Sequence, residues 1–226
     1  LAGLAVLIMA LFSFRYWKTK KSVTLLSIAS VFLMGFQGWL GATVVYSVLA
    51  PVRITIHMVM ALVIVAVLLY LLHTTSTRQT AHFKRGLFQN LLLLSILFTL
   101  IQIVLGTQVR QYVDDQIDIV GYDTKGLWLD NPTLQFYIHR SFSIAVLLVN
   151  GFLWWKNKTL GYGFQKLQWV MILLGLEIIS GLAMYYVDFP FGSQAIHLIL
   201  AALLFGVQFY ILLECFKALK LPNAVK

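Results

Sequence analysis

Three histidines in apolar stretches of the sequence are the residues best suited to chemistry in this chain. They are His57, His139 and His197. Neutral imidazole binds metal ions, and two imidazoles on facing helices can hold the iron of a b-type haem. A metal-binding side chain is costly in hydrocarbon and marks a functional site. The pattern therefore predicts haem ligation, with hydrogen bonding between neighbouring helices as the alternative.

Two of these histidines belong to an internal repeat with a shift of 140 residues. Gln37 precedes His57 by 20 residues, and Glu177 precedes His197 by the same number. Equal spacing in two apolar segments indicates a duplicated structural unit. We expect both histidines to occupy equivalent places in the two copies.

A polar residue followed by glycine four positions later occurs three times. The sequence Gln-x-x-Leu-Gly begins at Gln37 and at Gln102, and the variant Glu-x-x-Ser-Gly begins at Glu177. A spacing of four places both residues on one helix face. The glycine admits a macrocycle or, alternatively, a second helix at close range. A carboxyl group such as that of Glu177 needs a partner or a function within a span.

Two arginines lie beside the histidines in the sequence. Arg140 directly follows His139, and Arg53 precedes His57 by four residues. Guanidinium groups bind carboxylates in a bidentate manner, so both arginines are candidates for the haem propionates. The alternative is that they anchor the helices at the membrane interface.

The composition indicates an all-α, polytopic membrane protein. Of the 226 residues, 60% are hydrophobic, and the mean hydropathy is +0.86. The net charge of +9 does not indicate nucleic acid, because the basic residues fall in short loops between apolar segments. The single cysteine, Cys215, excludes a disulfide within the chain.

Apolar segments separated by polar loops predict seven transmembrane helices. The repeat divides them into two related halves, with residues 1–80 as an incomplete first half and 81–226 as the second. The predicted spans are residues 1–15, 23–49, 52–73, 87–110, 133–155, 165–187 and 193–217.

The distribution of charge predicts the orientation of the chain. Thirteen basic residues fall on one side of the predicted spans and four on the other, which also carries six of the eight acidic residues. The basic side is expected to be cytoplasmic. This places the C-terminus in the cytoplasm and all three histidines near the outer face of a bacterial plasma membrane. A long outer loop is predicted at 111–132, and His73 and His82 are expected to be solvated or interfacial.

At these residues the chain resembles the haem A synthases, which assemble the cofactor of cytochrome oxidase. The resemblance covers essentially the whole chain, in order, and implies seven transmembrane helices of a duplicated bundle of four plus four helices. Its matching stretches are Gln37-Gly-Trp-Leu-Gly-Ala-Thr-Val44, Arg53-Ile-Thr-Ile-His57, Gln102-Ile-Val-Leu-Gly106, Ile138-His-Arg140 and Ala195-Ile-His197.

The resemblance implies an activity, a cofactor and partners. Such enzymes oxidise a methyl group of haem O to a formyl group, which gives haem A. The resemblance implies that His139 and His197 hold haem b, and that His57 belongs to the half that receives haem O. Besides this substrate and the lipid bilayer, haem O synthase and a second copy of the chain are candidate partners.

The family pattern also implies residues before Leu1. In the first copy, the counterpart of His139 belongs to a Glu-x-x-His-Arg segment of the family. That segment would end directly before Leu1. We therefore expect this chain to be truncated at its start and to be inactive by itself. Two other functions stay open: a dihaem b-type electron-transfer cytochrome, and a haem carrier or assembly factor without catalysis.

Overall fold

The computed structural model describes residues 1–46, 51–76 and 86–218, and within these ranges the chain is helical without any strand. The chain divides into two compact units, Leu1–Gln79 and Thr80–Lys226. The prediction of an all-α protein is confirmed. Several residues used to predict orientation lie outside the described ranges, as does His82; these are Arg78, Lys84, Arg85, Lys220 and Lys226.

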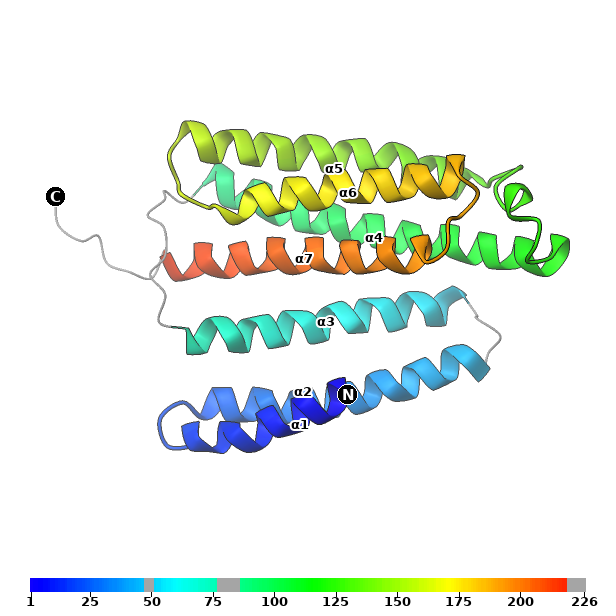
Figure 1. Ribbon diagram of the computed structural model, residues 1–226. Coiled ribbons are helices and arrows are strands. Elements are labelled where there is room, and N and C mark those ends of the chain that lie inside the picture. The colour runs from blue at the N-terminus through cyan, green and yellow to red at the C-terminus, as the bar shows by residue number, and fades with distance from the viewer. Residues whose placement is uncertain (47–50, 77–85, 219–226) are drawn as a thin grey trace. The chain divides into compact units, whose positions relative to one another are not determined.

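Unit 1 consists of three helices in sequence. They are α1 (Ala2–Ser13), α2 (Lys21–Tyr46) and α3 (Pro51–Thr75), and α2 packs against both α1 and α3. Figure 1 shows the tight turn that leads from α1 into α2. His73 near the end of α3 is 9% exposed, so of the two expected positions, solvated or interfacial, the solvated one is wrong and the interfacial one stays a prediction.

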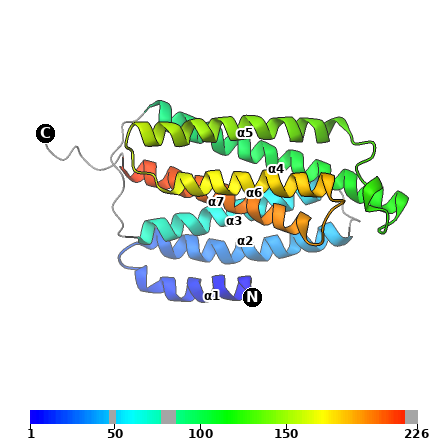
Figure 2. The same ribbon diagram turned by 45° about the horizontal axis from the view of Figure 1, so that its top comes forward.

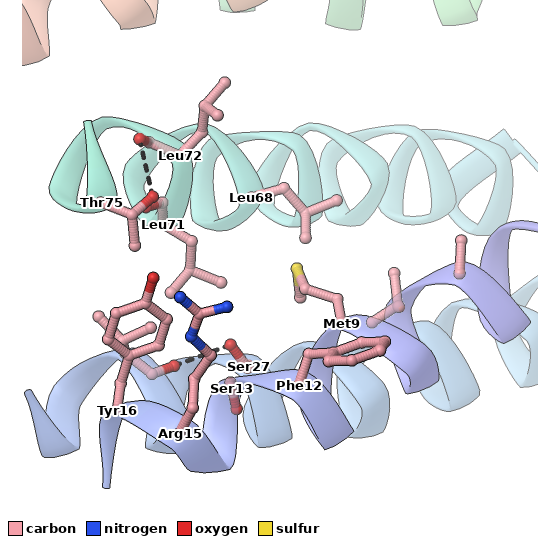
Figure 3. A pocket seen from close by; sticks show the side chains of 13 residues that line it. Met9, Phe12, Ser13, Arg15, Tyr16, Ser27, Leu68, Leu71, Leu72 and Thr75 are labelled. Carbon is pink, nitrogen blue, oxygen red and sulfur yellow. Dashed lines mark hydrogen bonds between the residues drawn. The ribbon is translucent and has the colours of Figure 1, made fainter. Parts of the chain in front are cut away.

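A pocket of about 550 Å³ opens among α1, α2 and α3. Figure 3 shows Met9 and the Arg15 side chain extending from the α1 side towards α3, where Leu68 and Leu71 form the opposite wall. Leu68 lies 11 residues after His57 on α3, which corresponds to about 16 Å along a helix. The pocket is therefore separate from the histidine of this unit.

Unit 2 is an antiparallel four-helix bundle (Figures 1 and 2). Its helices are α4 (Leu87–Val120), α5 (Leu134–Thr159), α6 (Lys166–Tyr186) and α7 (Ser193–Ala218). Each helix packs against its two neighbours in the ring α4–α5–α6–α7. The diagonal partners α5 and α7 make no backbone contact with one another within the described ranges. Side chains on their inner faces therefore meet in the bundle centre.

Six of the helices, α2 to α7, are long and apolar enough to cross a membrane. Their exposed surfaces are rich in large apolar side chains, as expected for helices that face lipid. The first predicted span corresponds to α1, which has only 12 residues, whereas a span needs about 20. Within the described ranges the structure thus supports a multi-pass membrane protein with six candidate spans, and the prediction of a seventh span is not confirmed.

Helix α4 is longer than predicted. The hydropathy pattern ends it at residue 110 and starts a loop, but the helix continues to Val120. The reason is an amphipathic stretch, because Val113, Ile117 and Val120 lie on one face and pack against Trp128 and its neighbours. With 34 residues, α4 is about 51 Å long, so it extends beyond a hydrocarbon layer of about 30 Å.

The extension of α4 and the loops beside it form an end cap on unit 2. We define this end cap as residues 111–133 and 187–192. In its core, Val113 and Trp128 are 2% exposed and Phe189 is 7% exposed. The Trp128 and Phe189 rings lie 5.1 Å apart between centroids. Phe189 has a φ angle of +51°, which is costly for a residue with a side chain. Burial of its ring against Trp128 offsets that strain.

We predict that Trp128→Ala loosens the end cap and leaves the bundle below it folded. Loss of a buried tryptophan side chain lowers stability by about 3–5 kcal/mol. We expect amide hydrogen exchange over residues 111–130 to be faster than in the unaltered protein. Leu127→Ala is the matched control, because Leu127 is 48% exposed and its truncation should leave exchange unchanged. Equal exchange in the two variants would contradict this account of the cap.

Candidate functional site

His139 and His197 face each other in the interior of unit 2. His139 lies in the first two turns of α5, and His197 occupies the same depth on the diagonal helix α7. Their ring centroids are 6.5 Å apart, and the ring planes meet at 70°. The two residues are 58 positions apart in the sequence, and the bundle brings them together.

His197 is oriented by two groups from α6. Its Nδ1 lies 2.9 Å from Glu177 Oε2 and 2.7 Å from Ser180 Oγ. The Ser180 hydroxyl donates its own hydrogen to the Glu177 carbonyl at 2.9 Å, so its oxygen can accept. Both groups can accept from an Nδ1–H donor, and in that tautomer the Nε2 lone pair of His197 is available as a ligand.

His139 is held by α4 through its main chain. Gln102 Nε2 donates to the His139 carbonyl oxygen at 3.0 Å. The His139 Nδ1 atom is buried and has no hydrogen-bond partner among the described residues. A Cβ atom added to Gly106 would lie 3.2 Å from Cε1 of the ring. A side chain at this position would force the imidazole to shift by a few tenths of an ångström, so glycine favours its close approach to α4.

His57 in unit 1 has the same surroundings. Gln37 Nε2 donates to the His57 carbonyl oxygen at 3.1 Å and lies 3.4 Å from Nε2 of the ring. A Cβ atom on Gly41 would again lie 3.2 Å from Cε1 of the imidazole. The His57 Nδ1 atom has no partner within the part of the chain that the structure describes.

One local arrangement therefore occurs three times, with a polar residue and a glycine on one helix and a histidine on the next. The sequence repeat relates only the copies at His57 and His197, because Gln102 and His139 are 37 residues apart rather than 20. The end cap accounts for this longer connection. The alternative that the glycines serve only helix packing is too simple, since all three face an imidazole ring.

Ser180 is a site residue that the sequence reasoning missed. It occupies the fourth position of the Glu-x-x-Ser-Gly variant, where the two other copies have Leu40 and Leu105. The sequence signal that could have identified it is the replacement of leucine by serine, three residues after a glutamate in an apolar helix. Only the His197 copy combines a carboxylate with a hydroxyl group.

The two predicted arginines lie at the edges of their units. Arg53 donates from Nη1 to the Thr43 carbonyl oxygen at 3.1 Å, and the Arg140 guanidinium lies 5.6 Å from the Tyr185 ring centroid. Both side chains are exposed, and neither forms an ion pair with a described residue. By contrast, Arg110 is bound to Asp114 through two contacts of 2.6 and 3.0 Å.

The chemistry of this site is that of paired imidazoles in an apolar bundle. Within the described ranges there is no group of three or more His, Cys, Asp or Glu side chains that could hold a metal ion. An arrangement of the zinc-site kind is therefore not found in these residues. Two imidazole nitrogens could hold a metal group whose other ligands do not come from the protein.

Comparison with known proteins identifies the family. The model of the family described as cytochrome oxidase assembly protein matches residues 1–209. The chain belongs to this family. The match confirms the family predicted from the sequence motifs. No curated protein matches the chain significantly.

We predict that Gly106→Ala displaces the His139 ring and destabilises this member of the assembly family. The added methyl group would meet the imidazole at 3.2 Å. The matched control is Gly151→Ala on α5, where nothing lies within 4 Å of the new Cβ. Alanine is a better helix former than glycine by up to about 1 kcal/mol, so the control should keep or raise the thermal unfolding midpoint. If both variants unfold at the same temperature, the steric argument is wrong.

Proposed function

We propose that this protein is a haem A synthase, a membrane oxidoreductase that converts a methyl group of haem O into a formyl group and so provides haem A for cytochrome oxidase. Membership of the cytochrome oxidase assembly family supports this proposal. The single observation that carries it is the pair formed by His139 and His197 across the centre of unit 2.

The separation of the two rings suits an iron atom between them. An imidazole nitrogen bonds a metal ion at about 2 Å and the ring centre lies roughly 1 Å further away, so two axial rings are about 6 Å apart. The observed distance between ring centroids is 6.5 Å. In the Nδ1–H tautomer, the Nε2 lone pair of His197 would also be available to hold the haem iron.

In this proposal the residues of unit 2 hold a haem b cofactor. A haem with two histidine ligands has no open coordination position and supplies one-electron transfer. Glu177 and Ser180 fix the tautomer and rotation of His197, and a carboxylate on the remote nitrogen raises the basicity of a ligating imidazole. Gln102 fixes the His139 main chain, and Gly106 gives its ring room.

Unit 1 is proposed to receive the haem O substrate. His57 is its candidate catalytic ligand, supported by Gln37 and Gly41 in the arrangement found at the other histidines. Arg53 and Arg140 are proposed to bind haem propionates, because both guanidinium groups are exposed and without a carboxylate partner among described residues. We further propose that the histidines lie towards the outer face and the C-terminus in the cytoplasm of a bacterium.

The first test removes the proposed haem b ligands one at a time. His139→Ala and His197→Ala should each abolish the tightly bound b-type spectrum of the purified full-length protein, because one axial ligand alone holds the haem weakly. His57→Ala is the control, since it changes the other unit and should keep this spectrum. An unaltered spectrum in either of the first two variants would exclude the proposed pair.

The second test measures turnover. Membranes that contain the full-length protein and a haem O synthase should yield haem A on pigment extraction, and His57→Ala should reduce the yield of haem A at least tenfold. If the protein binds b-type haem but haem O stays unchanged, the proposed enzyme activity is refuted. That outcome would favour the electron-transfer cytochrome or the haem carrier instead.

A further inference from the structure

A second set of polar side chains lies inside unit 2, apart from the histidines. Ser95 and Thr99 come from α4, Asn150 from α5 and Gln208 from α7. Their exposed fractions are 0% for Ser95, Asn150 and Gln208 and 2% for Thr99. We call these four residues the polar layer. Four fully buried polar side chains in an apolar bundle need partners within the protein.

Three residues of the polar layer, Ser95, Asn150 and Gln208, are joined by direct hydrogen bonds. Ser95 Oγ donates to Asn150 Oδ1 at 2.7 Å. Gln208 Nε2 donates to Ser95 Oγ at 2.9 Å and to Asn150 Oδ1 at 3.1 Å. Asn150 Nδ2 donates to the Val146 carbonyl oxygen at 2.8 Å. These bonds connect three of the four helices of the bundle.

The layer has a regular relation to the histidines. Asn150 follows His139 by 11 residues on α5, and Gln208 follows His197 by 11 residues on α7. Eleven residues make about three helical turns and about 16 Å. The polar layer thus occupies the same inner helix faces as the histidines, three turns away, and is not part of their site.

Two atoms of the layer have no protein partner among the described residues. They are the Oε1 atom of Gln208 and the Oγ1 atom of Thr99, and both are buried. Thr99 is one turn from Ser95 on α4, and Ser95 is bonded to Gln208, so both atoms belong to the same part of the core. A buried hydroxyl or amide oxygen without a hydrogen bond costs about 1–3 kcal/mol.

We propose that the polar layer is a binding site for an internal water molecule, which bridges Thr99 Oγ1 and Gln208 Oε1. Buried waters typically bond to two to four polar atoms that lack other partners. The hydroxyl of Thr99 can accept from or donate to the water, and the Gln208 oxygen accepts from it. All four side chains are neutral, which favours water over a cation.

The sign of the effect of Thr99→Val tests this proposal. Valine keeps the shape and removes the hydroxyl. If Thr99 binds the water, we expect the thermal unfolding midpoint of the full-length protein to fall by about 2–4 °C. If the hydroxyl has no partner, replacing it with a methyl group should leave the midpoint unchanged or raise it.

A double-mutant cycle identifies the shared water. Thr99→Val and Gln208→Met should be non-additive, because either change removes one partner of the same molecule. Thr107→Val is the matched control on α4: the Thr107 hydroxyl donates to the Val104 carbonyl oxygen at 2.7 Å, so its change should be additive with Gln208→Met. Additivity of Thr99→Val with Gln208→Met would overturn the proposal, whatever the size of the single effects.

A density map of the unaltered full-length protein gives a test that does not depend on variants. At a resolution that shows ordered water, we expect a peak within hydrogen-bonding distance of both Thr99 Oγ1 and Gln208 Oε1. Absence of the peak, or a direct hydrogen bond between these two side chains, would overturn the proposal.

Discussion

The structure depends on one constraint, which is that a polar group inside an apolar bundle needs a partner in the bundle interior, because lipid supplies none. In unit 2 this constraint explains most polar side chains between the helices. Glu177 and Ser180 accept from His197, Gln102 donates to the His139 carbonyl, and the polar layer bonds largely to itself. Each of these contacts joins two helices and so restricts their rotation and depth.

The contact between glycine and imidazole is the second recurring element of the structure. At Gly41 and Gly106 a side chain would press on the histidine ring at 3.2 Å, whereas at Gly181 the distance is 3.7 Å. The looser third copy is the one whose histidine is held by a carboxylate and a hydroxyl group. A ring fixed by hydrogen bonds at Nδ1 needs less support from packing. The three copies thus share a framework, but the copy at His197 orients its ring by hydrogen bonds as well as by packing.

The fold was largely predictable, and its main exception has a clear cause. Hydropathy located α2 to α7, because helices that face lipid need long apolar segments whatever they pack against. Hydropathy failed to predict the part of α4 after Arg110, where the helix continues through a sequence with three aspartates. There the helix is stabilised by one apolar face that packs on Trp128 and Phe189. That packing comes from distant loop residues, which no local pattern identifies.

The sequence by itself determined that the chain is a multi-pass helical membrane protein of the cytochrome oxidase assembly family, and it selected the three histidines with their polar and glycine neighbours. Local composition suffices for the membrane class and spacing for the histidines, whereas the family followed from the resemblance of several motifs. Only the tertiary structure decided that His139 faces His197, that Ser180 binds the latter, and that each glycine meets an imidazole. Such contacts depend on the rotation and depth of helices that are far apart in the sequence, and packing of the whole bundle sets both.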